Sequence, residues 1–235
     1  MGVNPSPSSN PSSNPWPSKS LAVNMTVKVK ICGLTTEASL DVALASGADM
    51  VGIVFFPPSP RHATASLAGT LAARARGRAK IVALMVDPSD AAVELAVAAA
   101  APDFIQLHGA ETPRRVAEIR RRWGPVIKAV AVETSDDVKG ALAYGEAADI
   151  ILFDARAPAD SGRPGGNGAA FDWRTLIGSG AAPFALSGGL TPDNVAEAIR
   201  VTGAAIVDVS SGVERRPGEK DFGLIRRFIH AAKSV

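Results

Sequence analysis

Short apolar runs alternate with amphipathic stretches along most of this chain. The runs are rich in Val, Ile, Leu and Phe with little polar alternation, which is typical of parallel strands covered on both faces. Strands are predicted at residues 27–31, 50–55, 80–86, 103–107, 126–131, 149–153, 183–186 and 205–209. The stretches that follow them predict helices at about residues 36–46, 64–76, 89–100, 111–122, 134–143, 171–178, 192–201 and 221–233.

The beginnings of several predicted helices carry capping signals. Thr35 stands before the first helix, Ser89 follows a proline, and Thr112 and Thr191 are each followed by one. Eight strand–helix units in strict alternation predict one closed (β/α)8 TIM barrel of the α/β class. An open doubly wound sheet is disfavoured, because its glycine fingerprint is absent from the turn Cys32–Thr35.

The first 24 residues differ from the rest in composition. They are dominated by Ser, Pro and Asn and offer little apolar surface to bury, so they are expected to form a disordered leader. The barrel, as a single catalytic domain, is assigned to residues 25–235.

Composition narrows the class of protein. The chain has 235 residues, a net charge of +2 and one cysteine, which excludes an intrachain disulfide and a cysteine-cluster metal site. Its longest apolar run is too short for a membrane span, and no signal peptide is visible. Five arginines in one predicted helix are interpreted as a solvated face: Arg114, Arg115, Arg120, Arg121 and Arg122. A cytoplasmic protein without a nucleic-acid or membrane partner is expected.

Functional residues of a (β/α)8 barrel lie on the loops at the carboxyl ends of its strands. Three late loops are rich in Gly and Ser, and consecutive backbone N–H groups in such loops can bind an anion. A single cluster of this kind is often an ordinary tight turn, but three neighbouring ones predict a phosphorylated substrate. The candidate phosphate-binding residues are Gly166, Gly168, Ser187, Gly188, Gly189, Ser210, Ser211 and Gly212.

Cys32 and Asp154 are the candidates for proton transfer. Cys32 ends the first predicted strand, and a thiol needs only modest help from its surroundings to act as a base near neutrality. Asp154 follows the apolar run Ile150–Phe153, where partial desolvation would make its carboxyl a plausible general acid. The alternatives are a small buried cysteine and a capping aspartate.

Three further residues are candidates for substrate binding. Arg61 follows a proline-stiffened loop, and its planar guanidinium suits a carboxylate or phosphate. His108 follows the fourth strand, and Asp208 lies within the eighth, facing either the barrel or its helical layer. Arg61 could instead form a surface ion pair, and His108 and Asp208 could be satisfied structural groups. Lys30, in the first strand, is expected to face away from Cys32.

Together these loops resemble those of phosphoribosylanthranilate isomerase, over residues 27–235. The matching segments are Lys30–Thr35, Gly52–Phe55, Ser59–Arg61, Gln106–Gly109, Phe153–Asp154, Gly165–Gly168, Phe171–Trp173, Leu186–Leu190, Asp208–Glu214 and Pro217–Gly218. Two positions depart from the family pattern. His62-Ala63 replaces a frequent aromatic residue, and Ala169-Ala170 replaces a commoner Lys-Thr pair.

The resemblance implies a cofactor-free and metal-free Amadori rearrangement in tryptophan biosynthesis. N-(5-phosphoribosyl)anthranilate would become 1-(2-carboxyphenylamino)-1-deoxyribulose 5-phosphate. By match to the family motifs, Asp154 protonates the ribose ring oxygen and Cys32 removes the C2′ proton. Arg61 would hold the anthranilate carboxylate, with Asp208 and His108 lining that pocket. The protein would be a monomer or a homodimer.

Three alternative hypotheses about the function compete with the isomerase. Indole-glycerol-phosphate synthase relies on lysine and glutamate at strand ends, and a histidine-pathway sugar isomerase would carry an aspartate in place of Cys32. A non-catalytic phosphate-binding barrel would need neither a strand-end thiol nor a strand-end carboxylate. The pairing of Cys32 with Asp154 therefore favours the isomerase.

Overall fold

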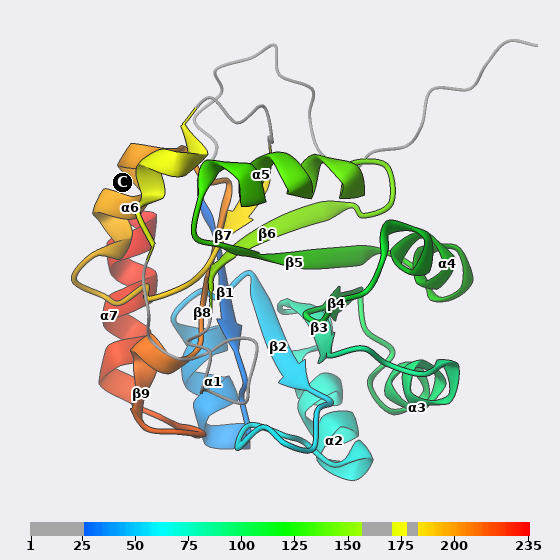
Figure 1. Ribbon diagram of the computed structural model, residues 1–235. Coiled ribbons are helices and arrows are strands. Elements are labelled where there is room, and N and C mark those ends of the chain that lie inside the picture. Colours follow the sequence, from blue (N-terminus) through cyan, green and yellow to red (C-terminus); the bar gives the residue numbers. More distant parts are fainter. Residues whose placement is uncertain (1–25, 157–170, 178–182) are drawn as a thin grey trace, which may run out of the picture.

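Eight parallel strands form a closed barrel and follow one another around it in chain order, with helices outside (Figure 1). The computed structural model describes residues 26–156, 171–177 and 183–235. The predicted TIM barrel is confirmed. The proposed leader, residues 1–24, lies outside the described residues.

The barrel strands coincide with the predicted apolar runs to within a few residues. They are β1 Lys28–Cys32, β2 Met50–Val54, β3 Lys80–Met85, β4 Phe104–Leu107, β5 Val126–Val132, β6 Ile150–Ala155, β7 Phe184–Leu186 and β8 Ile206–Val209. The α-helices are α1 Glu37–Ala45, α2 Ala65–Ala75, α3 Asp90–Ala100, α4 Pro113–Trp123, α5 Ser135–Ala141, α6 Val195–Thr202 and α7 Phe222–Lys233.

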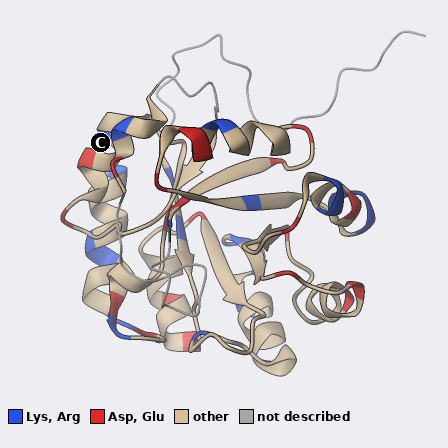
Figure 2. Cartoon of the chain, in the orientation of Figure 1, with Lys and Arg blue, Asp and Glu red and all other residues tan. Residues whose placement is uncertain are grey.

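The core has two parts because alternate strand residues point to opposite faces. One part lies between strands and helices, and the other fills the barrel. The interior cluster contains Met50, Val82, Phe104, Ile127, Ala129, Ile150, Leu152, Ala185 and Ile206. Charged positions are gathered mainly on helices and loops, and few lie on the strands (Figure 2). The few charged strand residues therefore need an explanation.

A repeated aspartate joins neighbouring strands at the amino-terminal end of the barrel. Asp49, Asp103 and Asp149 each precede a strand, and each carboxylate accepts the backbone N–H of a residue in the preceding strand, at 2.8–2.9 Å. Each also pairs with a basic side chain. These contacts lie at the end opposite the site loops, so we assign them to stability.

Two local predictions were wrong, and one hairpin was not predicted. The helix expected at 171–178 is, within the described residues, only the short 3-10 turn η2 Trp173–Leu176. The first helix is capped by Thr36, whose hydroxyl accepts the Ser39 N–H, and not by Thr35. After the 3-10 turn η3 Ser211–Val213 comes an unpredicted hairpin, β9 Glu214–Arg216 and β10 Glu219–Lys220. These strands are too short to leave a period in the sequence.

No helix in the described part of the chain combines the length and the apolar character that a membrane crossing requires.

Candidate active site

The sulfur of Cys32 lies at the carboxyl end of β1, where the strand turns into the loop before α1. The side chain is buried, with 4% of the residue exposed. Burial raises the pKa of the Cys32 thiol, while the nearby Lys30 ammonium acts to lower it. Cys32 thus ends β1 as the sequence predicted, and its sulfur is both desolvated and close to charge.

Gly52, on the neighbouring strand β2, makes the space for this sulfur. A Cβ atom at position 52 would lie 2.7 Å from Cys32 Sγ and 3.0 Å from its Cα. Such contacts are far inside van der Waals distance, so only glycine leaves the thiol where it is. The residues around Gly52 in the sequence give no sign of this role.

Gly52→Ala is therefore expected to fold but to lose activity. Moving a reacting group by about 1 Å can cost on the order of 10²-fold in rate. We expect kcat to fall by about 10–100-fold. A thermal unfolding curve of the same preparation should show that the variant is folded. Gly77→Ala is not a suitable control because its backbone φ is +76°, whereas Gly140 has open space around it. Gly140→Ala should leave kcat unchanged; equal losses in both variants would contradict a specific role for Gly52.

Lys30 was expected to face away from Cys32, and this was wrong. Residues two apart on a strand share a face, so Lys30 points into the barrel directly below Cys32. Its Nζ lies 3.0 Å from both carboxylate oxygens of Asp208, which points inward from β8. Burial works against the Lys30 charge, but Asp208 and Cys32 together outweigh it and the pKa of Lys30 is raised.

Arg61 lies across the end of β1, and its orientation is set by Glu214 of the hairpin. Its Nε and Nη2 donate to the two oxygens of Glu214, each at 2.8 Å. The stem passes over Gly33, where a Cβ would lie 2.5 Å from Arg61 Cδ and where φ is +73°. Arg61 is 5% exposed, so this is a buried, bidentate pair rather than a surface contact.

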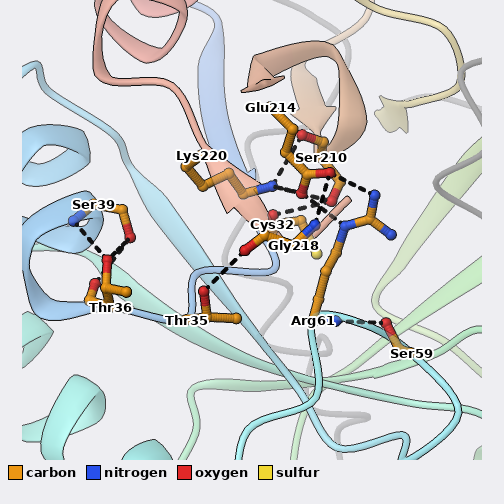
Figure 3. Close-up of polar contacts among 10 residues, drawn as sticks. All are labelled: Cys32, Thr35, Thr36, Ser39, Ser59, Arg61, Ser210, Glu214, Gly218 and Lys220. Carbon is orange, nitrogen blue, oxygen red and sulfur yellow. Dashed lines mark hydrogen bonds and ion pairs between the residues drawn. The ribbon is translucent and has the colours of Figure 1, made fainter. Parts of the chain in front are cut away.

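Lys220 approaches the same carboxylate from the other side (Figure 3). Its Nζ lies 2.7 Å from Glu214 Oε1 and also donates to the backbone oxygen of Ser210, at 2.9 Å. The Ser210 hydroxyl in turn donates to the backbone oxygen of Cys32, at 3.1 Å. One buried network thus joins Arg61, the hairpin and the end of β1, and sequence reasoning had missed Glu214 and Lys220 as its members.

Glu214→Gln is expected to destabilise the protein strongly, because it removes the buried negative charge that both Arg61 and Lys220 contact. Breaking a buried ion pair costs about 3–5 kcal/mol. The effect should also depend on pH. Burial acts to raise the pKa of Glu214, but Arg61 and Lys220 outweigh it, so the pKa is lowered. A lowered pKa adds stability above the ordinary glutamate pKa, and this is lost as pH falls through the folded value.

Urea unfolding from neutral to acid pH measures both effects. The wild type should lose stability progressively below the ordinary glutamate range, and the Glu214→Gln curve should be lower at neutral pH and flatter on the acid side. Glu219→Gln, in the same hairpin but pairing with exposed arginines, is the control and should change little. A Glu214→Gln protein as stable as the wild type at neutral pH would contradict the importance of the network.

Asp154 is the last residue but one of β6 and contacts His108. Its Oδ2 lies 3.1 Å from His108 Nε2, and its Oδ1 accepts the Ala155 N–H at 3.0 Å. The other ring nitrogen of His108 lies 3.4 Å from the amide nitrogen of Gln106, which also points inward from β4. Gln106 Oε1 has no hydrogen-bond partner among the described residues. The structure therefore places His108 beside the candidate acid.

The acid and the base lie on the same rim of the barrel. In the closed ring, β6 and β1 are separated only by β7 and β8. The end of β6 contacts the loop after β7, and the loop after β7 contacts the loop after β8. A Cβ at Gly188 would lie 2.3 Å from Ala155 N, and one at Gly212 would lie 1.8 Å from Leu190 O. The predicted glycine loops after β7 and β8 therefore stand between Asp154 and Cys32.

Backbone conformation in these loops suits an anion site. Gly188 and Gly189 both have positive φ, and no hydrogen bond joins either N–H to another described residue. Ser187, Ser210, Ser211 and Gly212 are half-buried at the same rim. The other predicted phosphate-binding residues, Gly166 and Gly168, lie outside the described residues. Over the described part of the chain, no group of His, Cys, Asp or Glu has the grouping of a metal site.

Comparison with known proteins agrees with this geometry. A family profile described as "N-(5'phosphoribosyl)anthranilate (PRA) isomerase" matches residues 29–231. A relative of that name from Rhodopseudomonas palustris (strain HaA2) is 57% identical over 212 residues, covering 89% of this chain and 97% of its own. One from Bradyrhizobium sp. (strain ORS 278) is 55% identical over 213 residues, covering 90% and 97%.

Two solved structures extend the comparison. Phosphoribosyl anthranilate isomerase from Thermotoga maritima is 36% identical, with a TM-score of 0.81, over 89% of this chain and all of that one. A second phosphoribosyl anthranilate isomerase, in complex with reduced 1-(o-carboxyphenylamino)-1-deoxyribulose 5-phosphate, is 34% identical, with a TM-score of 0.78 and the same coverage.

Fold and site together define a (β/α)8-barrel enzyme whose candidate acid and base flank glycine-rich loops. More closely, the chain belongs to the N-(5'-phosphoribosyl)anthranilate isomerase family. It is an isomerase of tryptophan biosynthesis.

Proposed function

We propose that residues 25–235 catalyse the Amadori rearrangement with Asp154 as general acid and Cys32 as general base. The observation that carries this assignment is the position of the two groups on one rim, separated by the loops after β7 and β8. A phosphorylated sugar bound in those loops would lie between a carboxyl and a sulfur. Holding both groups against one substrate converts the two proton transfers into intramolecular steps.

Each proton that moves in the proposed reaction has a donor and an acceptor. Asp154 donates a proton to the ribose ring oxygen, the bond from that oxygen to C1′ breaks, and an open-chain Schiff base forms. The Cys32 thiolate removes the C2′ proton, giving an enolamine that tautomerises to the ketone. One turnover leaves the sulfur protonated and Asp154 ionised, so both must exchange with solvent before the next.

His108 is the positioning residue for the acid in this proposal. It contacts Asp154 through Nε2, and its side chain is 14% exposed, so it also lies towards solvent. Gln106 on the other side of the ring keeps the imidazole in the plane that reaches the carboxyl. This arrangement supports a role in orienting Asp154 and in its reprotonation after each turnover.

Substrate binding is assigned to two regions. The phosphate is placed on the backbone N–H groups of the loops Ser187–Gly189 and Ser210–Gly212, where the glycine backbone permits close approach. The anthranilate carboxylate is placed at Arg61, whose guanidinium is held in one orientation by Glu214.

A coupled assay tests the reaction. Anthranilate and phosphoribosyl pyrophosphate, with the upstream transferase, generate the fluorescent phosphoribosylanthranilate in situ, and its disappearance reports isomerisation. We expect the purified chain to accelerate the loss of fluorescence in proportion to its concentration, in the presence of a chelator. A decay rate equal to that without the chain would contradict the proposal.

A further inference from the structure

A buried ion pair inside the barrel lies directly beneath the candidate base. Lys30 is 1% exposed and Asp208 is 4% exposed, and the Nζ of Lys30 lies 3.0 Å from both oxygens of the carboxylate. The two residues are register partners on the adjacent strands β1 and β8. Both charges are therefore fixed in position and shielded from water.

Stability alone does not account for this pair. Desolvating two charges costs about as much as their attraction returns, and apolar side chains of similar volume serve a core equally well. The nearest interior neighbours of the pair include Met50, the register partner of Lys30 on β2, and Ile206, two residues before Asp208 on β8, and both are apolar. The buried pair therefore lies between this apolar interior and the end of β1 that carries Cys32.

Lys30 also acts on the sulfur. It lies on the same inward face as Cys32, two residues earlier on β1, and its ammonium charge acts to lower the pKa of the thiol. The other charged groups that act on the sulfur are Asp208 from β8, Lys220 from β10 and Arg61 from the loop after β2. Glu214 is the counter-ion of the last two.

We infer that Lys30, held in place by Asp208, is the cation that stabilises the thiolate form of Cys32 and so keeps the base competent. This rests on the proposed role of Cys32 in the reaction. Lys30 remains an ammonium throughout, and the C2′ proton goes only to sulfur, so Lys30 is a positioning residue. Asp208 has two opposed effects, since it anchors the cation and its own charge disfavours the thiolate.

Removing the charge of Lys30 and removing the charge of Asp208 should shift the ionisation midpoint of Cys32 in opposite directions. In Lys30→Met the pH at which Cys32 is half-ionised should rise by about one unit or more. In Asp208→Asn it should fall, because the amide oxygen can still accept from Lys30 while the negative charge is gone. The chain has a single cysteine, so the signal belongs to one residue. The midpoint is measured on the unliganded protein, from the pH dependence of iodoacetamide alkylation and from thiolate ultraviolet absorbance after subtraction of the Cys32→Ala spectrum.

Lys128→Met is the matched control. Lys128 is likewise a buried lysine on a barrel strand and pairs with a buried carboxylate, Glu111, at 2.8 Å. It is not among the groups that act on the sulfur, so its removal should leave the thiolate midpoint unchanged. A loss of packing or of general stability would shift the thiolate midpoint of Cys32 in both lysine variants alike.

The outcomes separate the inference from the proposed function. An unchanged or lowered midpoint in Lys30→Met overturns the inference. Should that variant fail to fold, Lys30→Met in the Asp208→Asn background must raise the midpoint relative to Asp208→Asn alone, and no rise overturns it equally. If the midpoint moves as expected but the acid limb of kcat/KM does not follow, Cys32 is not the base, and the proposed function fails instead.

Discussion

Cys32→Ala is expected to lower kcat by about 10³–10⁴-fold, the upper part of the range that a positioned acid or base contributes. The alanine cannot accept the C2′ proton, and no other described side chain at the end of β1 offers a base to replace it. KM should change little, because the sulfur contributes to the transition state and not to substrate binding. The measurement is steady-state loss of substrate fluorescence.

Cys32→Ser tests whether the loss of activity comes from the missing base or from altered packing at the end of β1. Serine preserves the approximate shape at the end of β1 but its hydroxyl is a far weaker acid than a thiol, so no comparable anion forms. We expect both variants to melt near the wild-type temperature and both to be inactive. A Cys32→Ala enzyme that retains more than about a tenth of wild-type turnover would end the proposed role of the thiol.

Asp154→Asn is the second change with a large expected effect, about 10³-fold or more on kcat. The amide is nearly the same size as the carboxyl and can still accept the Ala155 N–H, but it has no acidic proton for the ribose oxygen. Ring opening should become rate-limiting. Because the same loss must appear in kcat and kcat/KM if the interaction exists only in the transition state, both constants are needed.

Asp193→Asn is the control for the general effect of replacing a carboxylate by an amide. Asp193 has a side chain that is 78% exposed and pairs with an exposed arginine, so its replacement should leave kcat unchanged. If Asp154→Asn raised KM and left kcat intact, Asp154 would be a binding group and the acid would have to be sought elsewhere.

The positions of the candidate acid and base were predictable because they follow directly from the pattern of strands. Cys32 and Asp154 each end an apolar run, and parallel strands in a barrel place such ends on one rim. The glycine loops after β7 and β8 were predictable for the same reason. Each of these inferences uses only the order of residues along one strand and the loop that follows it.

Residues whose partners are distant in the chain were not predictable in the same way. Glu214 and Arg61 are 153 residues apart, and Lys30 and Asp208 are 178 apart. Nothing in either local sequence says that these charges cancel one another. Gly52 is similar, because its significance depends on a sulfur on the adjacent strand. The error on Lys30 was of another kind, since the period of two already places it on the same face as Cys32.

The order of apolar and polar residues by itself determined the closed barrel, its strand ends and the thiol and carboxyl that stand there, because strand and helix periods are local properties. Only the tertiary structure decided the environment of those groups. It buried Lys30 against Asp208 under the sulfur, and it closed the Glu214 hairpin over Arg61. Desolvation and charge pairing act through space between strands far apart in the chain, and they set the protonation state on which the chemistry depends.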